Sequence, residues 1–167
     1  MDYVVLVDSN DVEVGVMEKM EAHRKGILHR AFSVLIYNSK GELLLQKRAA
    51  HKYHSGGLWT NTCCSHPAPG EDLLIAANRR LEEEMGIKGI QLTVENSMIY
   101  KTDFENGLME HELDYILKGI SDADPVMNPN EAEDFRWMAI ADLKSDVNLF
   151  PEKYTFWLKE MIRKNIL

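Results

Sequence analysis

The order of hydrophobic and polar residues divides the chain into strand-rich parts and two helical segments. Alternating or apolar runs bounded by turn-forming residues are typical of strands. Two pairs of such runs predict hairpins: Tyr3–Val7 with Val12–Met17 around residues 8–11, and Ala31–Tyr37 with Glu42–Lys47 around residues 38–41. Further strands are predicted at Gln91–Tyr100, Leu113–Leu117 and Phe135–Met138, with a loop rich in His, Lys and Gly at Ala49–Gly57.

The pattern becomes helical after Pro69. From Glu71 onward, apolar residues recur at helical spacing: Leu74, Ala77, Leu81 and Met85. Gly86 predicts the end of this acidic helix, and a second helix is predicted from Pro151 to the C-terminus. Strands arranged around one long helix and closed by another predict an α/β domain with a mixed sheet.

Length and composition restrict the class of protein. A chain of 167 residues with 45 % hydrophobic and 28 % charged residues is typical of one globular domain, here residues 1–167. The net charge of −8 argues against binding to duplex nucleic acid, which requires a basic face. No apolar run approaches the roughly 18 residues of a membrane span. Acidic residues follow a short apolar run at the N-terminus, so no signal peptide is expected. We therefore expect a cytoplasmic location. The sequence does not indicate the oligomeric state.

Both cysteines of the chain lie in the stretch TNTCCSHP, residues 60–67. Adjacent Cα atoms are about 3.8 Å apart, below the usual disulfide range, and no second Cys pair suggests a zinc site. If the segment is extended, Cys64 and His66 share one face and Cys63 points to the other. Cys63 is then expected in the core, where free cysteines are common, while the role of Cys64 stays open.

The acidic helix resembles the Nudix box, G-x5-E-x7-R-E-U-x-E-E-x-G-U, in which U is a bulky aliphatic residue. The matching positions are Glu71, Arg79, Leu81, Glu83, Glu84, Gly86 and Ile87. Carboxylates at these offsets suit Mg²⁺ held against a diphosphate. Two positions differ: Ser65 replaces the first Gly, and Arg80 replaces the Glu that follows Arg79. We therefore expect a reduced hydrolytic apparatus, with Arg80 free to contact phosphate oxygens.

These differences, together with TNTCCSHP, are similar to those of the type I isopentenyl-diphosphate isomerases, a Nudix-fold family that shifts a double bond. The similarity extends over most of the chain: Glu18-Lys19, Ala22-His23, Leu28–Ser33, Lys47–Ala49, Lys52, Leu58–Asn61, Cys64, His66-Pro67, Gly70-Glu71, Arg79-Arg80, Tyr100, Glu110–Glu112 and Trp157. The resemblance implies a Nudix-type mixed sheet sandwiched between helices. It also implies isopentenyl diphosphate as the substrate.

The resemblance further implies the residues of the site. One Mn²⁺ or Zn²⁺ would be held by His23, His29, His66, Glu110 and Glu112. A Mg²⁺ would be held by Glu84 and the substrate, whose diphosphate would contact Lys19, Arg48, Lys52 and Arg80. Cys64 and Glu112 would exchange protons with the isoprenoid, assisted by Tyr100, while Trp157 would face the cationic intermediate.

Two alternatives remain open at the level of sequence. A Nudix hydrolase of a nucleoside diphosphate derivative is the first, although such hydrolysis needs neither Arg80 nor the Cys64 thiol. The second is a non-catalytic interaction module stabilised by metal, which would depend on its metal for folding.

Overall fold

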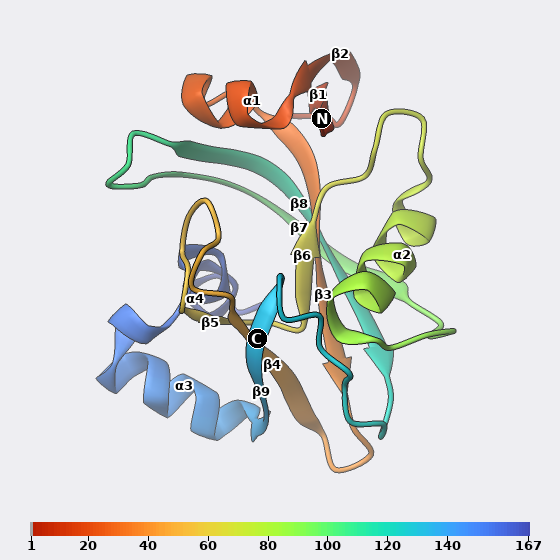
Figure 1. Cartoon of the computed structure of the whole chain (residues 1–167), viewed down its shortest axis with the longest axis vertical. Helices are drawn as coiled ribbons and strands as arrows, with labels where there is room; N and C mark the ends of the chain where they lie inside the picture. Colours follow the sequence, from red (N-terminus) through yellow and green to blue (C-terminus); the bar gives the residue numbers. More distant parts are fainter. Residues whose placement is uncertain (1) are drawn as a thin grey trace.

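The computed structural model describes residues 2–167, and within them nine strands form one mixed sheet (Figure 1). The strands are Tyr3–Val7 (β1), Glu13–Glu18 (β2), His29–Tyr37 (β3), Glu42–Arg48 (β4), Trp59–Thr60 (β5), Cys63–Ser65 (β6), Thr93–Asp103 (β7), Met109–Ile120 (β8) and Ala132–Ala139 (β9). The helices are Lys19–Lys25 (α1), Leu73–Met85 (α2), Ile140–Leu149 (α3) and Phe156–Arg163 (α4), with a short 3-10 helix at Pro151–Lys153 (η1).

Strand β3 is the centre of the sheet. It pairs in parallel with β8 along its whole length, from His29 beside Glu112 to Tyr37 beside Ile120. It pairs antiparallel with the short strand β6, which sets Ser33 beside Cys64. Strands β3 and β4 share a register pair only next to their turn, after which β4 pairs with β9 and β5. In the predicted second hairpin, the two strands are therefore paired only next to the turn.

Helices cover both faces of the sheet, as the sequence predicted. Along β3, Phe32 and Val34 pack with α2 in one hydrophobic core, whereas Leu35 packs with α3 and α4 in the other. This alternation follows from the two-residue period of a strand. Figure 1 shows α2 on one side of the sheet and α3 and α4 on the opposite side.

Helix α2 begins and ends at residues that the local sequence favours. The Asp72 side chain accepts hydrogen bonds from the backbone N–H groups of Leu74 and Ile75, so the helix begins just after the predicted Glu71. Gly86 ends the helix with φ of +65°, and a Cβ there would lie 2.6 Å from the Val126 carbonyl oxygen. The box residues are thus on a helix with fixed ends.

The structure corrects three expectations about secondary structure. Helices α1 and α3 were not predicted, and β7 and β8 extend beyond the predicted strands, to Asp103 and from Met109, where they pair as a hairpin. The predicted single helix after Pro151 is wrong, because η1 and α4 are separated at residues 154–155. There the Thr155 side chain caps α4 by accepting from the Leu158 N–H, and Tyr154 pairs with Trp59. The other predicted strands and the loop at residues 49–57 are confirmed. Among the described residues, no helix has the length and apolar character needed to cross a membrane.

Candidate active site

Strand register brings three predicted site residues into one row. Tyr100 on β7 lies beside Glu112 on β8, and Glu112 lies beside His29 on β3. Cross-strand partners present their side chains on the same face of a sheet. The Tyr100 hydroxyl lies 2.8 Å from Glu112 Oε1 and 2.5 Å from Glu110 Oε1, so its one proton can be donated to either carboxylate and the hydroxyl joins the two.

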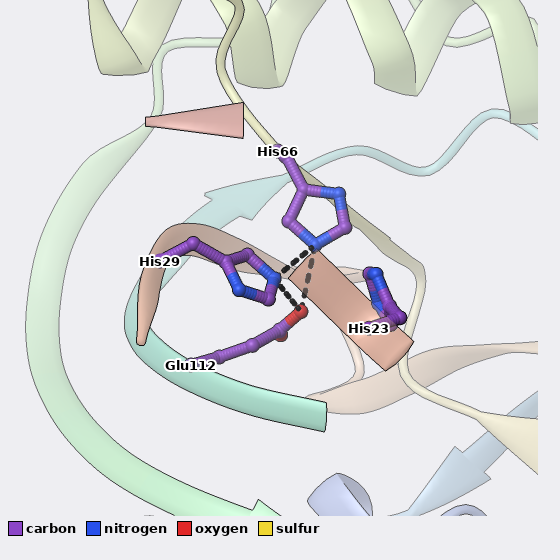
Figure 2. A group of neighbouring side chains, drawn as sticks. All are labelled: His23, His29, His66 and Glu112. Carbon is purple, nitrogen blue, oxygen red and sulfur yellow. Dashed lines mark hydrogen bonds and ion pairs between the residues drawn. The ribbon is translucent and has the colours of Figure 1, made fainter. Parts of the chain in front are cut away.

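A cluster of imidazoles surrounds Glu112 (Figure 2). Glu112 Oε2 lies 2.7 Å from His66 Nε2 and 3.2 Å from His29 Nε2, and these two nitrogens are 3.3 Å apart. His23, from α1, completes a group of four residues whose ligand atoms all lie within 4.8 Å of one another. All four side chains come from different elements, so only the tertiary structure assembles them.

A second group shares His23 with the first. It consists of His23, His54 and Glu110, again with ligand atoms within 4.8 Å. Glu110 Oε2 lies 2.8 Å from His54 Nε2 and 3.6 Å from His23 Nε2. His54 comes from the loop between β4 and β5 and was not among the predicted site residues.

The orientation of these side chains fits a divalent metal. His23 Nδ1 donates to the Lys19 carbonyl at 2.7 Å, and His29 Nδ1 to the Ile27 carbonyl at 2.8 Å, which leaves both Nε2 atoms with a lone pair. The buried Nε2 atoms of His23 and His54 have no hydrogen-bond partner despite their short distances to Glu110. Around a metal with bonds of about 2.1 Å, neighbouring ligand atoms lie about 3.0–3.4 Å apart and point at the ion rather than at each other. The observed distances are close to this range.

Burial and neighbouring groups shift the pKa values of the two carboxylates in opposite directions. Burial alone would raise the pKa of Glu112, but His66 and His29 outweigh it and hold this pKa well below its usual value. Burial would likewise raise the pKa of Glu110, but the neighbouring imidazoles of His23 and His54 lower it to about 2. Both carboxylates are therefore charged acceptors at neutral pH. Burial lowers the pKa of His66, which favours the neutral imidazole that a metal requires.

The Cys64 thiol borders a small cavity beside this cluster. The cavity has a volume of about 30 Å³, and its lining includes Cys64, Tyr100, Glu112, Trp157 and Arg48. The Trp157 indole N–H donates to Cys64 Sγ at 3.0 Å, and Sγ donates to Asn61 Oδ1 at 3.1 Å. The Arg48 guanidinium lies over the Trp157 ring at 5.2 Å from its centre. The four residues predicted to be catalytic thus line one space.

The two cysteines lie on opposite faces of β6, as predicted from the two-residue period. Cys63 is fully buried in the core beneath α2, and Cys64 is partly buried on the side of α4. Burial raises the pKa of both thiols far above the usual value. Both therefore keep their protons at neutral pH.

A larger pocket of about 340 Å³ opens next to His66. Its lining includes Lys19, Lys52 and Arg80, which were predicted to contact phosphate, together with Arg79. The predicted phosphate contact Arg48 lies instead in the small cavity, where its Nη2 donates to the His54 carbonyl at 3.1 Å.

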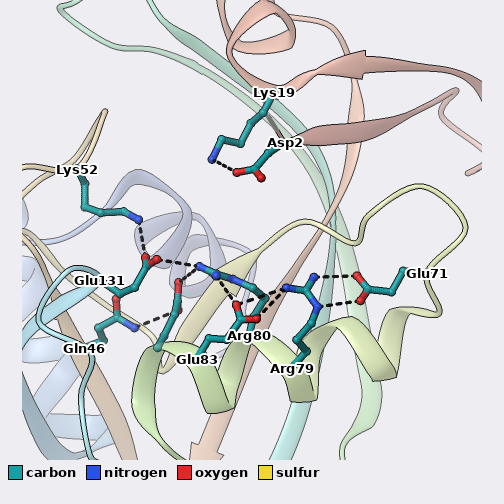
Figure 3. Close-up of polar contacts among 10 residues, drawn as sticks. Asp2, Lys19, Gln46, Lys52, Glu71, Arg79, Arg80, Glu83 and Glu131 are labelled. Carbon is teal, nitrogen blue, oxygen red and sulfur yellow. Dashed lines mark hydrogen bonds and ion pairs between the residues drawn. The ribbon is translucent and has the colours of Figure 1, made fainter.

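Each of these three cations has an acidic partner in the pocket (Figure 3). Lys19 Nζ lies 3.2 Å from Asp2, and Lys52 Nζ lies 2.6 Å from Glu131. Arg80 contacts Glu83, Glu84 and Glu131 at 2.6, 3.0 and 3.3 Å. The pocket therefore alternates cationic and anionic side chains, an arrangement that suits a diphosphate accompanied by a divalent cation.

Glu84 is the only predicted metal-ligating carboxylate that lies on α2. It is buried, and it accepts from Arg80 at 3.0 Å and from Gln46 at 3.4 Å. It thus lies at the side of the cationic pocket, apart from the imidazole cluster.

Sequence reasoning did not identify several residues that contact the predicted site residues. They include His54 beside Glu110, Glu131 between Lys52 and Arg80, and the pair of Ser33 and Asp114 beside Cys64. Ser33 Oγ donates to Asp114 Oδ2 at 2.7 Å and lies 3.5 Å from Cys64 Sγ. The alternation along β8, which sets Glu110, Glu112 and Asp114 on one face, was a signal for Asp114. No local signal marked His54 or Glu131.

Comparison with known proteins agrees with this geometry. The family model of the NUDIX domain matches residues 27–162. The chain is 53 % identical to isopentenyl-diphosphate Delta-isomerase 1 of Aromatoleum aromaticum over 99 % of its own length and 93 % of that protein. It is 52 % identical to isopentenyl-diphosphate Delta-isomerase of Pectobacterium atrosepticum over 93 % of its length and 87 % of that protein.

Similarity to solved structures supports the fold. A crystal structure of a protein from Deinococcus radiodurans superposes with a TM-score of 0.81 at 22 % identity, covering 98 % of each chain. A MutT protein from Methanosarcina mazei superposes with a TM-score of 0.62 at 19 % identity, covering 83 % of this chain and 95 % of that one. The chain belongs to the isopentenyl-diphosphate Delta-isomerase family and contains a NUDIX domain.

Proposed function

We propose that this protein interconverts isopentenyl diphosphate and dimethylallyl diphosphate by adding one proton and removing another. One observation carries the proposal: Cys64 and Glu112 line the same small cavity, which shares His66 with the pocket of cationic side chains. Glu112 and His66 also belong to the imidazole cluster. The names of relatives more than 50 % identical over nearly the whole chain support it. We infer that one domain, residues 1–167, contains the whole site, since its residues lie on the strands of a single sheet and on the helices and loops that pack against that sheet.

The reaction requires two proton-exchanging groups in a dry space. Protonation of C4 of the terminal alkene places a positive charge on C3, and loss of a proton from C2 then forms the new double bond. One group ends the turnover without its proton and the other gains one, so the atoms balance and the two roles exchange in the reverse direction. Water must be excluded, because it would capture the cation.

Cys64 and Glu112 are the two groups we assign to these proton transfers. The thiol at Cys64 Sγ is held by Trp157 and Asn61, and the carboxylate of Glu112 receives the Tyr100 hydroxyl. Tyr100 therefore orients Glu112 and can pass a proton to it. The rings of Trp157 and Tyr100 line the cavity, where their π electrons attract a developing positive charge.

We assign two metal ions to the site. One Mn²⁺ or Zn²⁺ would be held by His23, His29, His66, Glu110 and Glu112, because imidazole with carboxylate suits these ions. When bound, it supplies a fixed positive charge that holds both carboxylates ionised and oriented. A Mg²⁺ held by Glu84 and the substrate would supply charge neutralisation of the diphosphate.

Lys19, Lys52 and Arg80 would bind the diphosphate in the larger pocket. Their present acidic partners are exchanged for phosphate oxygens when substrate binds, so Asp2 and Glu131 also set the affinity. Arg48 lies further in, over Trp157, where it would reach the phosphate end of a substrate whose alkene enters the cavity. The cavity of about 30 Å³ holds no more than about two water molecules, so its walls must move apart to admit five carbon atoms.

The test is incubation of the metal-loaded protein with isopentenyl diphosphate and Mg²⁺ in deuterated water. We expect dimethylallyl diphosphate that carries deuterium, no product with Cys64→Ala, and no phosphate release from a panel of nucleoside diphosphate derivatives. Phosphate release from a nucleotide without isomerisation would instead show a Nudix hydrolase and contradict the proposal.

A further inference from the structure

His54 lies beside the imidazole cluster on a segment that contributes none of the metal ligands assigned above. It is on the loop between β4 and β5, and its side chain is only 2 % exposed. Its Nε2 lies 2.8 Å from Glu110 Oε2, a shorter distance than the 3.6 Å from His23 Nε2 to the same oxygen. By distance, His54 is at least as well placed toward Glu110 as His23 is.

The direction of the His54 ring argues against a simple hydrogen bond. The His54 Nε2 atom has no hydrogen-bond partner although Glu110 is near, and the His23 Nε2 atom likewise has none. A ring N–H and a ring lone pair point in the same direction, so neither would point at the carboxylate oxygen. Ligands of one ion have this relation: their atoms are close, and each lone pair points at the ion.

An unpaired imidazole nitrogen in this position needs an explanation. Burial of a polar atom without a partner is unfavourable, so such atoms are rare in folded proteins. His54 Nδ1 has a partner, because Ser55 Oγ lies at 3.2 Å. The Nε2 atom is the one that remains for a ligand bond.

We propose that His54 is a further ligand of the transition metal at this centre, which adds a fourth imidazole to His23, His29 and His66. The inference rests on the proposed metal centre and deepens it. The two groups share His23, and the Tyr100 hydroxyl joins Glu110 to Glu112, so His54 extends one centre rather than forming a separate site. A divalent ion that accepts imidazole together with carboxylate, such as Zn²⁺ or Mn²⁺, is the class of ligand it takes.

Ligation by His54 would connect the metal to the loop that covers the site. The His54 ring stacks on Phe104 at 4.3 Å between centres, with 9° between the planes. The Arg48 side chain donates to the His54 carbonyl, and Lys52 lies two residues before it in the diphosphate pocket. Metal binding would therefore fix the loop that carries Lys52 and that accepts a hydrogen bond from Arg48.

The experiment compares metal affinity in His54→Ala and His54→Gln with that in His51→Ala. His51 is an exposed histidine of the same loop and serves as the matched control. Competition with a chelator should show affinity for Zn²⁺ at least about tenfold weaker in both His54 variants and unchanged in His51→Ala. Circular dichroism of the metal-free variants checks that each is folded, and the Gln variant retains a polar side chain at this position.

X-ray absorption at the zinc edge distinguishes direct ligation from a hydrogen bond to Glu110. We expect the number of imidazoles at the ion to fall by one in His54→Ala and to stay constant in His51→Ala. A constant imidazole number, an unchanged affinity, or a second equivalent of bound Zn²⁺ that disappears in His54→Ala would each overturn the inference. Wild-type protein that binds no metal or fails to isomerise would instead contradict the proposed function.

Discussion

Cys63 and Cys64 are neighbours in the chain but have opposite surroundings. Cys63 is enclosed in the core beneath α2, near Glu84 and away from the small cavity. Cys64 contacts Trp157, Asn61 and Ser33 at the cavity. The difference follows from one step along a strand, which turns a side chain to the other face.

This contrast gives a prediction for the two thiols. Cys64→Ala should lower kcat by at least about a hundredfold, because it removes a proton-exchanging group. Cys64→Ser should also have a very low kcat, since a hydroxyl is a far weaker acid than a thiol. Cys63→Ala should retain most activity and lose about 1 kcal/mol of unfolding free energy. Both proteins are assayed at equal metal content, and similar losses of kcat in the two would contradict the assignment of Cys64.

Glu71 and Arg79 form the best-defined ion pair of the Nudix box. Arg79 donates to both carboxylate oxygens of Glu71 at 2.8 Å. These hydrogen bonds lower the pKa of Glu71 below its usual value. A carboxyl with a lowered folded-state pKa stabilises the fold above its unfolded pKa of about 4.3, and this stabilisation is lost as the pH falls through the folded-state value.

Glu71→Gln should therefore destabilise the protein at pH 7 and not in strong acid. The Arg79 side chain is 40 % exposed, so screening by water limits the effect to about 0.5 kcal/mol. Urea unfolding at pH 7 and in strong acid measures this loss of stability. Glu105→Gln, in the exposed turn before β8, is the control. A loss of stability that is independent of pH would show that the ion pair is not its cause.

At the scale of elements, α2 carries the residue that departs most from the hydrolytic box. Arg80 stands where a carboxylate belongs, and it contacts Glu83, Glu84 and Glu131 at the edge of the diphosphate pocket. Burial disfavours the charged form of the Arg80 guanidinium and would lower its pKa, but Glu84 and the other acidic residues raise this pKa overall. Arg80 therefore remains charged at any pH at which the protein is folded.

Replacing Arg80 should affect binding of the diphosphate. Arg80→Glu should raise KM for isopentenyl diphosphate about ten- to a thousandfold, because repulsion replaces a charge-assisted hydrogen bond. Arg80→Gln, which avoids a fourth carboxylate in this cluster, should raise KM by a smaller factor. Neither variant should release phosphate from nucleotides.

Arg163→Glu serves as the control for this change of charge, since Arg163 pairs with Glu160 near the exposed end of α4. Steady-state kinetics at saturating Mg²⁺ measures KM in all three variants. An unchanged KM in Arg80→Glu would show that Arg80 does not contact the diphosphate.

The loop at residues 49–57 and the turn between β7 and β8 meet above the cavity. The Asn106 side chain donates to the Tyr53 carbonyl at 2.8 Å, and Phe104 stacks on His54. Because the cavity must widen to admit the isoprenoid, these contacts have to loosen during turnover.

Asn106→Ala should loosen this loop without affecting the sheet. Hydrogen exchange at the amides of Lys52 and Gly57, which donate to Ala49 and Arg48, should become faster, whereas exchange in β3 and β8 should not change. Asn130→Ala, at an exposed position before β9, is the matched control. Equal exchange in the loop of Asn106→Ala and wild type would contradict a role for this contact.

At the scale of the whole molecule, the imidazole cluster joins elements that lie far apart in the sequence. Its residues come from α1, β3, the segment after β6 and β8. An ion bound by all of them connects the first and second halves of the chain and binds only the folded chain. Metal should therefore contribute to global stability.

Removal of metal should lower the melting temperature. Zn²⁺ at about one hundred times its Kd adds about 2.7 kcal/mol to the free energy of unfolding. For a domain of this size, this raises the melting temperature by roughly 5–10 °C. His29→Ala should lose most of this shift, whereas His51→Ala should retain it. Differential scanning calorimetry with and without metal measures both, and an unchanged melting temperature in the wild type would contradict metal binding at the cluster.

The sequence by itself determined the features that depend on neighbouring residues. Turn clusters and two-residue alternation located the main strands, and Gly86 located the end of α2. The same alternation separated Cys63 from Cys64, and the resemblance to a family indicated most of the residues that the structure brings together. These are short-range properties, because side-chain direction and helix ends depend on a few adjacent positions.

Only the tertiary structure decided which distant residues meet. The parallel pairing of β3 with β8 sets His29 beside Glu112, 83 positions later, and no local pattern fixes that register. The same holds for His54 beside Glu110 and for Glu131 between Lys52 and Arg80. The break before α4 also depends on a distant partner, since Tyr154 pairs with Trp59. Contacts of this kind arise from the packing of the whole chain, and the sequence expresses them only through that packing.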